Sequence, residues 1–180
     1  MKTTTLIFIC FLLINSSCKS QSHIVSKLEK SMLESKDIVD SSRISLLNHL
    51  RLELFKKLKS KNISEEFILL ENLSLVGFSY DGIIYSKSKA YLFSKSGTST
   101  LELNEISKEE VLNRKNSISS CALNEVLNGN LSSLLIENEA RIETHSTFYL
   151  TISKEKETKF NLLKSLCFVD ANGKTFWGVD

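Results

Sequence analysis

The sequence contains no proline and only six glycines among its 180 residues. It also lacks internal repeats, low-complexity tracts and any proline-rich linker that would divide it into parts. The residues that follow the leader described below are enough for one domain of ordinary size. These absences predict a single domain.

Several catalytic signatures are absent as well. There is no glycine-rich phosphate loop, no G-x-S-x-G elbow, no H-E-x-x-H motif, and no CxxC pair or Cys/His spacing that would bind zinc. No metal and no cofactor is therefore expected. Because catalytic groups need to be close only in space, the missing motifs favour a non-enzymatic role without excluding an enzyme.

An excess of charge of one sign is also missing. The chain has 23 Lys and Arg against 21 Asp and Glu, and Lys2 is the one basic residue of the leader. A net charge so close to zero provides no field that would attract a polyanion. Nucleic acid is therefore not an expected partner.

The first 17 residues have the composition of a secretory leader. Lys2 supplies the positive charge, and residues 6–14 carry no charged or strongly polar side chain. A transmembrane helix needs about 20 apolar residues, whereas the apolar region of a signal peptide needs about 7 to 15. We therefore expect this segment to be removed and not to span a membrane.

The leader ends in Asn15, Ser16, Ser17 and Cys18. This sequence resembles the lipobox of bacterial lipoprotein precursors in the looser form of flavobacterial leaders, although the family usually has an apolar residue where this chain has Asn15. The resemblance implies that Cys18 carries a lipid that holds the mature protein on a membrane of the cell envelope, in the periplasm or at the surface. The alternative is an ordinary signal peptide and a soluble secreted protein.

Two of the four cysteines remain for the folded domain, because Cys10 lies in the leader and Cys18 would be acylated. The remaining pair is Cys121 and Cys167. An exported protein meets an oxidising environment, which favours a disulfide between them. The alternative is two buried thiols that never meet.

Helical periodicity dominates the first part of the domain. Apolar residues recur at helical spacing over residues 22–39, and a second helix with Asp40 or Ser41 as its N-cap follows at once. The two segments predict a helical hairpin. The apolar stripe of the second helix consists of Leu47, Leu50, Leu54 and Leu58.

An antiparallel meander is predicted over residues 73–103, where β-branched and aromatic residues alternate with small polar ones. Asp81-Gly82 is a strong signal for a type I′ turn, which would pair Phe78 with Tyr85.

A second hairpin is predicted at Ser96-Gly97. Alternation along its strands would separate two sets of residues, of which the first should face the core. The core-facing set is Ala90, Leu92, Leu101 and Leu103, and the opposite set is Tyr91, Phe93, Thr100 and Glu102.

Helices are predicted in the middle of the sheet-forming region. Ser107 and Glu110 form a capping-box pattern, after which the helical periodicity breaks and resumes over residues 117–128. Gly129 is a natural residue to end the second piece. Residues 131–136 fit either a helix or a strand.

Two further elements are predicted near the C-terminus. Residues 147–153 alternate as a half-buried strand does, and Asn172-Gly173 would close a last hairpin. The chain would then finish inside the sheet. The expected cross-strand pairs are Val169 with Phe176 and Phe168 with Trp177.

Together these elements predict one α+β domain with an N-terminal helical hairpin and an antiparallel sheet, formed by the meander and the C-terminal hairpin, into which helices are inserted. On this interpretation residues 1–17 are the signal peptide, residues 18–22 a short tether, and residues 23–180 the domain.

Glu143 and His145 are the one pair of residues that would be tested first for catalysis. Two positions apart on a strand, they would share a face, as a carboxylate–histidine dyad requires; a solvated polar edge is the alternative. Ser86 and Lys89 satisfy the S-x-x-K pattern of serine enzymes. That nucleophile begins a helix, however, and this segment is predicted to be a polar turn.

Two surface features would suit binding. A basic cluster at the end of the second helix, Lys56, Lys57, Lys59 and Lys61 with Arg51, either complements the helix dipole or contacts anionic lipid or polymer. Aromatic residues of the sheet would form a flat binding patch if their face were exposed. They are Tyr80, Tyr85, Tyr91, Phe93 and Trp177.

The favoured function is a non-enzymatic binding or interaction module of the cell envelope. Its partner would be another protein or a surface polymer, and Cys18 would provide contact with the membrane. One alternative is a small hydrolase of peptidoglycan or glycan that uses Glu143 and His145. The other is a structural or assembly subunit of a membrane complex.

Overall fold

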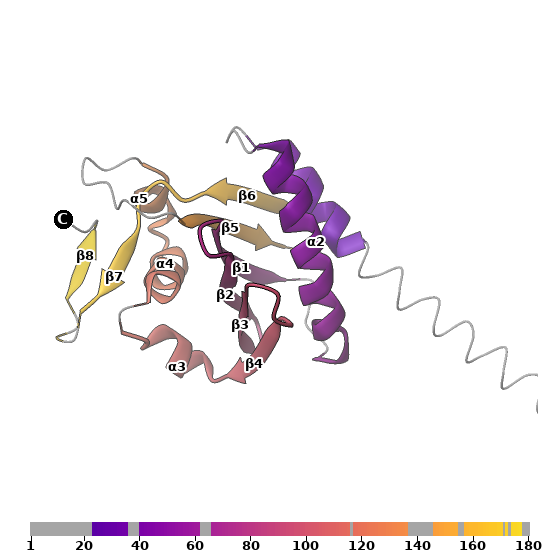
Figure 1. Cartoon of the computed structure of the whole chain (residues 1–180). Coiled ribbons are helices and arrows are strands. Elements are labelled where there is room, and N and C mark those ends of the chain that lie inside the picture. Colours follow the sequence, from indigo (N-terminus) through magenta and orange to yellow (C-terminus); the bar gives the residue numbers. More distant parts are fainter. Residues whose placement is uncertain are drawn as a thin grey trace, which may run out of the picture.

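A computed structural model of the chain describes residues 23–35, 40–61, 66–115, 117–136, 146–154, 157–170, 172 and 174–177. A six-stranded antiparallel sheet lies between two groups of helices, and a small two-stranded sheet packs outside the second group (Figure 1). This is the single α+β domain that the sequence predicts.

The two N-terminal helices cover one face of the sheet. The first spans residues 23–33, and α2 (Ser41–Leu58) continues into a short 3-10 helix, η1 (Lys59–Lys61). Asp40 caps α2, because its carboxylate accepts a hydrogen bond of 2.9 Å from the backbone N–H of Ser42. The leucine stripe of α2 is fully buried against the sheet, as predicted.

The six strands follow the order β4-β3-β2-β1-β5-β6, and every neighbouring pair is antiparallel. The strand at the centre, β1, lies earlier in the chain than the predicted start of the sheet at Leu73. Its first residues form a continuous apolar run, which is typical of a strand buried on both faces and does not show the alternation of a half-buried one. The strands are β1 (Phe67–Ser74), β2 (Ser79–Ser86), β3 (Ala90–Ser96), β4 (Glu102–Ile106), β5 (Ser146–Ser153) and β6 (Thr158–Leu162).

Asp81 and Gly82 do not form a turn, so this prediction is wrong. They lie inside β2, where Gly82 is opposite Glu71 of β1, and the turn between β1 and β2 consists of residues 75–78. Gly77 in that turn has a φ of 72°. Gly82 is required for a different reason, since a Cβ atom there would lie 1.9 Å from the carbonyl oxygen of Leu70.

The predicted division of the second hairpin between a core face and an outer face is also wrong, because both faces of the sheet are covered. Residues 97–101 link β3 to β4, and the register places Leu103 opposite Phe93. Leu103 therefore points to the α2 face together with the buried Tyr91 and Phe93. Ala90 and Leu92 point to the opposite face.

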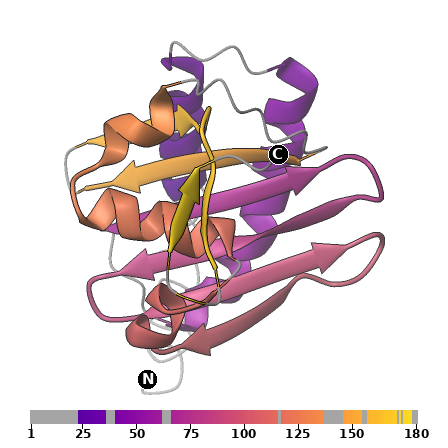
Figure 2. The same ribbon diagram turned by 90° about the vertical axis from the view of Figure 1, so that its left-hand side faces the viewer.

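Three short helices cover that opposite face, and the C-terminal hairpin packs on the outer side of the second of them (Figure 2). The predicted caps are confirmed: the hydroxyl of Ser107 accepts a 3.0 Å hydrogen bond from the N–H of Glu110, and Gly129, with a φ of 82°, follows the second of these helices. Residues 131–136, ambiguous in sequence, begin as a helix. The elements are α3 (Lys108–Leu112), α4 (Ile118–Leu127), α5 (Leu131–Leu135), β7 (Cys167–Val169) and β8 (Thr175–Trp177).

The C-terminal hairpin forms as predicted, but as a separate sheet and with a register shifted by one residue. Phe168 pairs with Phe176, where the sequence suggested Trp177. The backbone N–H of Asp170 donates to the carbonyl of Lys174, so the loop holds three residues and not two. The Asp170 carboxylate stabilises this loop by accepting a 2.9 Å hydrogen bond from the N–H of Lys174.

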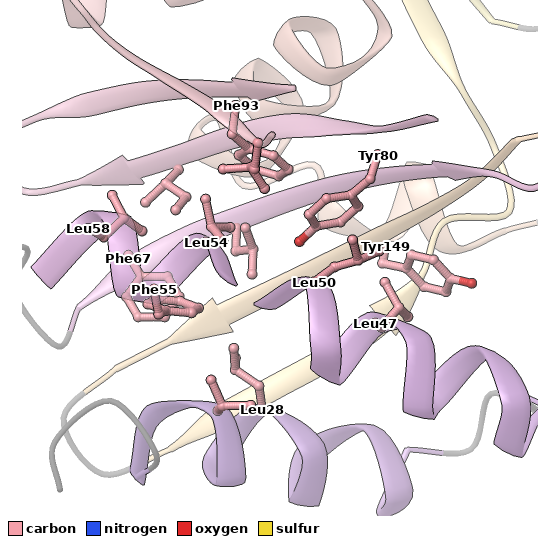
Figure 3. Packing of buried hydrophobic residues seen from close by; sticks show 14 of the residues in the cluster. Leu28, Leu47, Leu50, Leu54, Phe55, Leu58, Phe67, Tyr80, Phe93 and Tyr149 are labelled. Atoms are coloured by element: carbon pink, nitrogen blue, oxygen red, sulfur yellow. The ribbon is translucent and has the colours of Figure 1, made fainter. Parts of the chain in front are cut away.

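A buried ion pair joins α2 to the sheet. Arg51 was grouped with the exposed lysines by its position in sequence, but its side chain is completely buried and points to Glu71 on β1. The Arg51 Nε atom donates to a Glu71 oxygen at 2.9 Å, and the Tyr80 hydroxyl donates to the same oxygen at 2.8 Å. Figure 3 shows buried side chains of α2 and the sheet that pack on the same face, with Tyr80 among them.

Candidate functional site

Three residues singled out from the sequence, Cys18, Glu143 and His145, lie outside the described residues. Cys121 and Cys167, for which two alternatives were open, form a disulfide with a Cα–Cα distance of 5.7 Å. It connects α4 to β7. Among the described residues, no three or more His, Cys, Asp or Glu side chains form a group that could hold a metal ion.

The aromatic residues of the sheet do not form the exposed patch that was considered. Tyr80, Tyr91 and Phe93 are buried beneath the N-terminal helices. Tyr85 and Trp177 are half-buried on the opposite face. The patch is absent because helices cover both faces of the sheet, which alternation along the strands cannot reveal.

Ser86 and Lys89 form a tight polar turn between β2 and β3, as predicted. The N–H of Ser86 donates to the carbonyl of Lys89 at 2.8 Å, and the N–H of Lys89 donates to the Ser86 hydroxyl at 3.2 Å. The Lys89 ammonium instead pairs with Glu105 at 3.0 Å. The serine is therefore not activated by this lysine.

A hollow of about 540 Å³ opens at one end of the sheet, where β1 begins and β2 and β5 end. Its wall on the other side comes from the start of α3 and the end of α4. The apolar part of its lining includes Ile68, Tyr85, Ile152 and Leu127, and the last of these is 43% exposed. This shallow, open apolar surface can contact the hydrocarbon part of a ligand along one side.

Lysines surround this apolar surface. Of the described residues that line the hollow, three are lysines, Lys87, Lys108 and Lys154, and one, Glu66, is acidic. Among these described residues, positive charges therefore outnumber negative ones. The sequence gives no sign of this arrangement, because the three lysines come from separate connections of the sheet.

Lys108, the first residue of α3, is the lysine whose position is fixed best. Its ammonium donates to the carbonyl oxygen of Lys87 at 2.6 Å. It also lies 4.6 Å from the centre of the Tyr85 ring, a distance at which the ring face attracts a cation. Because the Lys108 side chain is already held in this way, it loses little conformational freedom when a ligand binds. The entropy cost of binding is therefore smaller.

No protein-family model, no curated protein and no solved structure matches this chain. None of the helices in the described part of the chain is long and apolar enough to cross a membrane. What the hollow can hold therefore follows from its own side chains. They suit a ligand that has an apolar chain and an anionic group.

Proposed function

We propose that this protein is a non-enzymatic binding module, held at the bacterial cell envelope by a lipid on Cys18. The leader supports export, and the sequence around Cys18 supports lipidation. The disulfide between Cys121 and Cys167 adds support for export, because disulfides persist in the periplasm and at the cell surface and are rare in the cytosol.

The ligand that we propose is an amphiphilic anion, an acyl or similar apolar chain that ends in a carboxylate or phosphate. The observation that carries this proposal is the position of the Lys108 ammonium above the apolar lining of the hollow. The apolar chain would cover Ile68 and Ile152, and the anionic group would take the remaining hydrogen-bond donors of Lys108. Charge-assisted hydrogen bonds of this kind are stronger than neutral ones.

Titration calorimetry with decanoate tests the ligand class directly. We expect Lys108→Met to weaken decanoate binding at least about tenfold, because a hydrogen bond to a charged group contributes about 1.5–3 kcal/mol. Methionine keeps most of the apolar stem of the lysine. The matched control, Lys56→Met on the exposed side of α2, should bind decanoate as the wild type does.

The head-group charge provides the second arm of this experiment. Decyltrimethylammonium has the same apolar chain and the opposite charge, so it should bind at least tenfold more weakly than decanoate. Equal binding of the two amphiphiles, or equal binding of decanoate by the wild type and Lys108→Met, would contradict the proposed ligand. An acidic peptide that binds where decanoate does not would show that the partner is a protein.

The anchor is tested separately in a bacterial host. Wild-type protein should lose residues 1–17, gain the mass of a lipid and remain with the membranes, whereas Cys18→Ala should gain no lipid and leave the membrane fraction. Intact-mass measurement and fractionation check both results. Cys10→Ala is the control, because Cys10 lies in the removed leader. If wild type and Cys18→Ala are both soluble and free of lipid, the protein is secreted and not anchored.

A further inference from the structure

A second, smaller hollow of about 330 Å³ lies on the same face of the sheet, beside the start of α4. It shares no lining residue with the first hollow, which lies near the opposite end of α4. Its polar lining comes from three strands, from the start of α4 and from the connection that precedes it. Asp81 belongs to β2, Ser94 to β3, Asn104 to β4, Arg114 and Ser117 to the connection between α3 and α4, and Ser119 to α4.

Asp81 is a partly buried carboxylate, and few interactions compensate for the loss of water around its charge. One of its oxygens accepts a 3.1 Å hydrogen bond from the side-chain amide of Asn72. Among the described residues, no lysine, arginine or histidine pairs with Asp81. Burial raises the pKa of the Asp81 carboxyl, and the hydrogen bond from Asn72 only partly opposes this change. Such a group is costly to keep in a fold and is often found where a ligand binds.

Asn72, which holds Asp81, is itself incompletely satisfied. Its side-chain oxygen is buried and has no hydrogen-bond partner in the described part of the protein. The two side chains lie opposite each other on β1 and β2. The fold thus places Asp81 in the lining of the hollow with Asn72 bonded to it, and it leaves hydrogen-bonding capacity on both side chains.

Arg114 supplies the opposite charge to the same hollow. Its guanidinium forms no ion pair with Asp81, nor with any other carboxylate of the described residues. Among the described residues of the lining, Arg114 and Asp81 are the only charged side chains. The hollow therefore presents one negative and one positive group that do not neutralise each other.

We propose that this hollow binds a small zwitterion of the α-amino acid class, with its ammonium on Asp81 and its carboxylate on Arg114. The guanidinium fork matches the two oxygens of a carboxylate, and the Asp81 carboxylate accepts hydrogen bonds from an ammonium group. The volume lies at the lower end of the range for ligand sites, which favours a small molecule. This site is independent of the proposed amphiphile site, because the two have no residue in common.

The zwitterion is tested by NMR titration of the ¹⁵N-labelled mature protein with each of the twenty L-amino acids and with D-alanine. Ethylamine and propionate, which carry only one of the two charges, are titrated beside them. We expect at least one amino acid to shift resonances of residues that line the hollow, and to bind at least tenfold more tightly than either one-charge probe. If no amino acid shifts these resonances, or if ethylamine or propionate binds equally well, the proposal is wrong.

Two substitutions separate the roles of the charges. Asp81→Asn keeps an acceptor for Asn72. It should weaken the binding of the amino acid and of ethylamine at least tenfold, and it should leave the binding of propionate unchanged or stronger. Arg114→Gln should weaken the binding of the amino acid and of propionate but not the binding of ethylamine. The controls are Glu109→Gln and Lys57→Gln, exposed residues outside the hollow, which should bind as the wild type does. A uniform loss for all probes in Asp81→Asn and Arg114→Gln would contradict the assignment of charges.

Stability provides a readout that does not depend on the ligand. Because the pKa of Asp81 is raised in the folded state, its contribution to stability decreases as the pH rises from the usual aspartate value through the folded pKa. Asp81→Asn should therefore be more stable than the wild type at neutral pH, and this gain should disappear at low pH. Thermal unfolding at pH 3 and pH 7 measures both. A variant less stable than the wild type at pH 7 would show that Asp81 is structural and would overturn the proposed role.

Discussion

Glu71→Ala will lower the free energy of unfolding by about 3–5 kcal/mol, because it leaves the charge of Arg51 buried without its partner. Arg51 is completely buried, and both of its donor groups that face β1 bond to the Glu71 carboxylate. Removing the carboxylate also leaves the Tyr80 hydroxyl without its acceptor. Urea unfolding followed by circular dichroism measures the loss.

Two further variants distinguish this explanation from simple loss of packing. The double variant Arg51→Met/Glu71→Leu removes both charges and keeps similar volumes, so it should recover most of the stability that Glu71→Ala loses. Glu105→Ala breaks an exposed ion pair with Lys89 and should cost at most about 1 kcal/mol. If Glu71→Ala costs no more than Glu105→Ala, the buried pair does not hold α2 to the sheet.

Loss of the disulfide is expected to lower the free energy of unfolding by about as much as Glu71→Ala does. The bridge joins residues 46 positions apart, and closing a loop of that length in the unfolded chain stabilises the folded state by about 4 kcal/mol. The midpoint of urea unfolding should therefore decrease on reduction. Cys121→Ala/Cys167→Ala should unfold near the midpoint of the reduced wild type and should not respond to reductant. Equal midpoints for oxidised and reduced wild type would contradict this prediction.

The elements that could be predicted from the sequence are those specified by neighbouring residues. The cap at Ser107 and the end of a helix at Gly129 depend on interactions within a few positions. The periodicity of α2 is equally local, because every third or fourth residue faces the sheet. These elements are confirmed.

The elements that were missed depend on the arrangement in space. β1 gave no alternating pattern because helices cover both of its faces, and Tyr91 was expected on an outer face that does not exist. Gly82 was interpreted as a turn residue although a neighbouring strand approaches it closely. Local sequence does not distinguish these two uses of glycine.

The sites could not be predicted for the same reason. Lys108 lies above the Tyr85 ring only when α3 packs on the sheet. In the same way, Asp81 and Arg114 line one hollow only when α4 packs on the sheet. Arg51 was assigned to a basic surface because lysines follow it in sequence, yet its partner Glu71 lies 20 positions further on. Charged residues reveal their roles here only through tertiary packing.

The central place of β1 determines the order in which the chain can assemble. Its Ser74 pairs with Ser79 of β2 across a short turn, but on its other side it pairs with Ser146 of β5, which the chain reaches only after β4 and three helices. Contacts between distant segments form late, since the entropy cost of closing a loop increases with its length.

In a chain whose β5 has not yet paired, β1 would be the edge of the four strands β4-β3-β2-β1. Unpaired backbone groups on such an edge can pair with another chain, so we expect this state to be prone to aggregation. The loop closed by Cys121 and Cys167 contains both β5 and β6. Oxidation of this pair after docking therefore makes it harder for β5, which covers the edge of β1, to separate from it again together with β6.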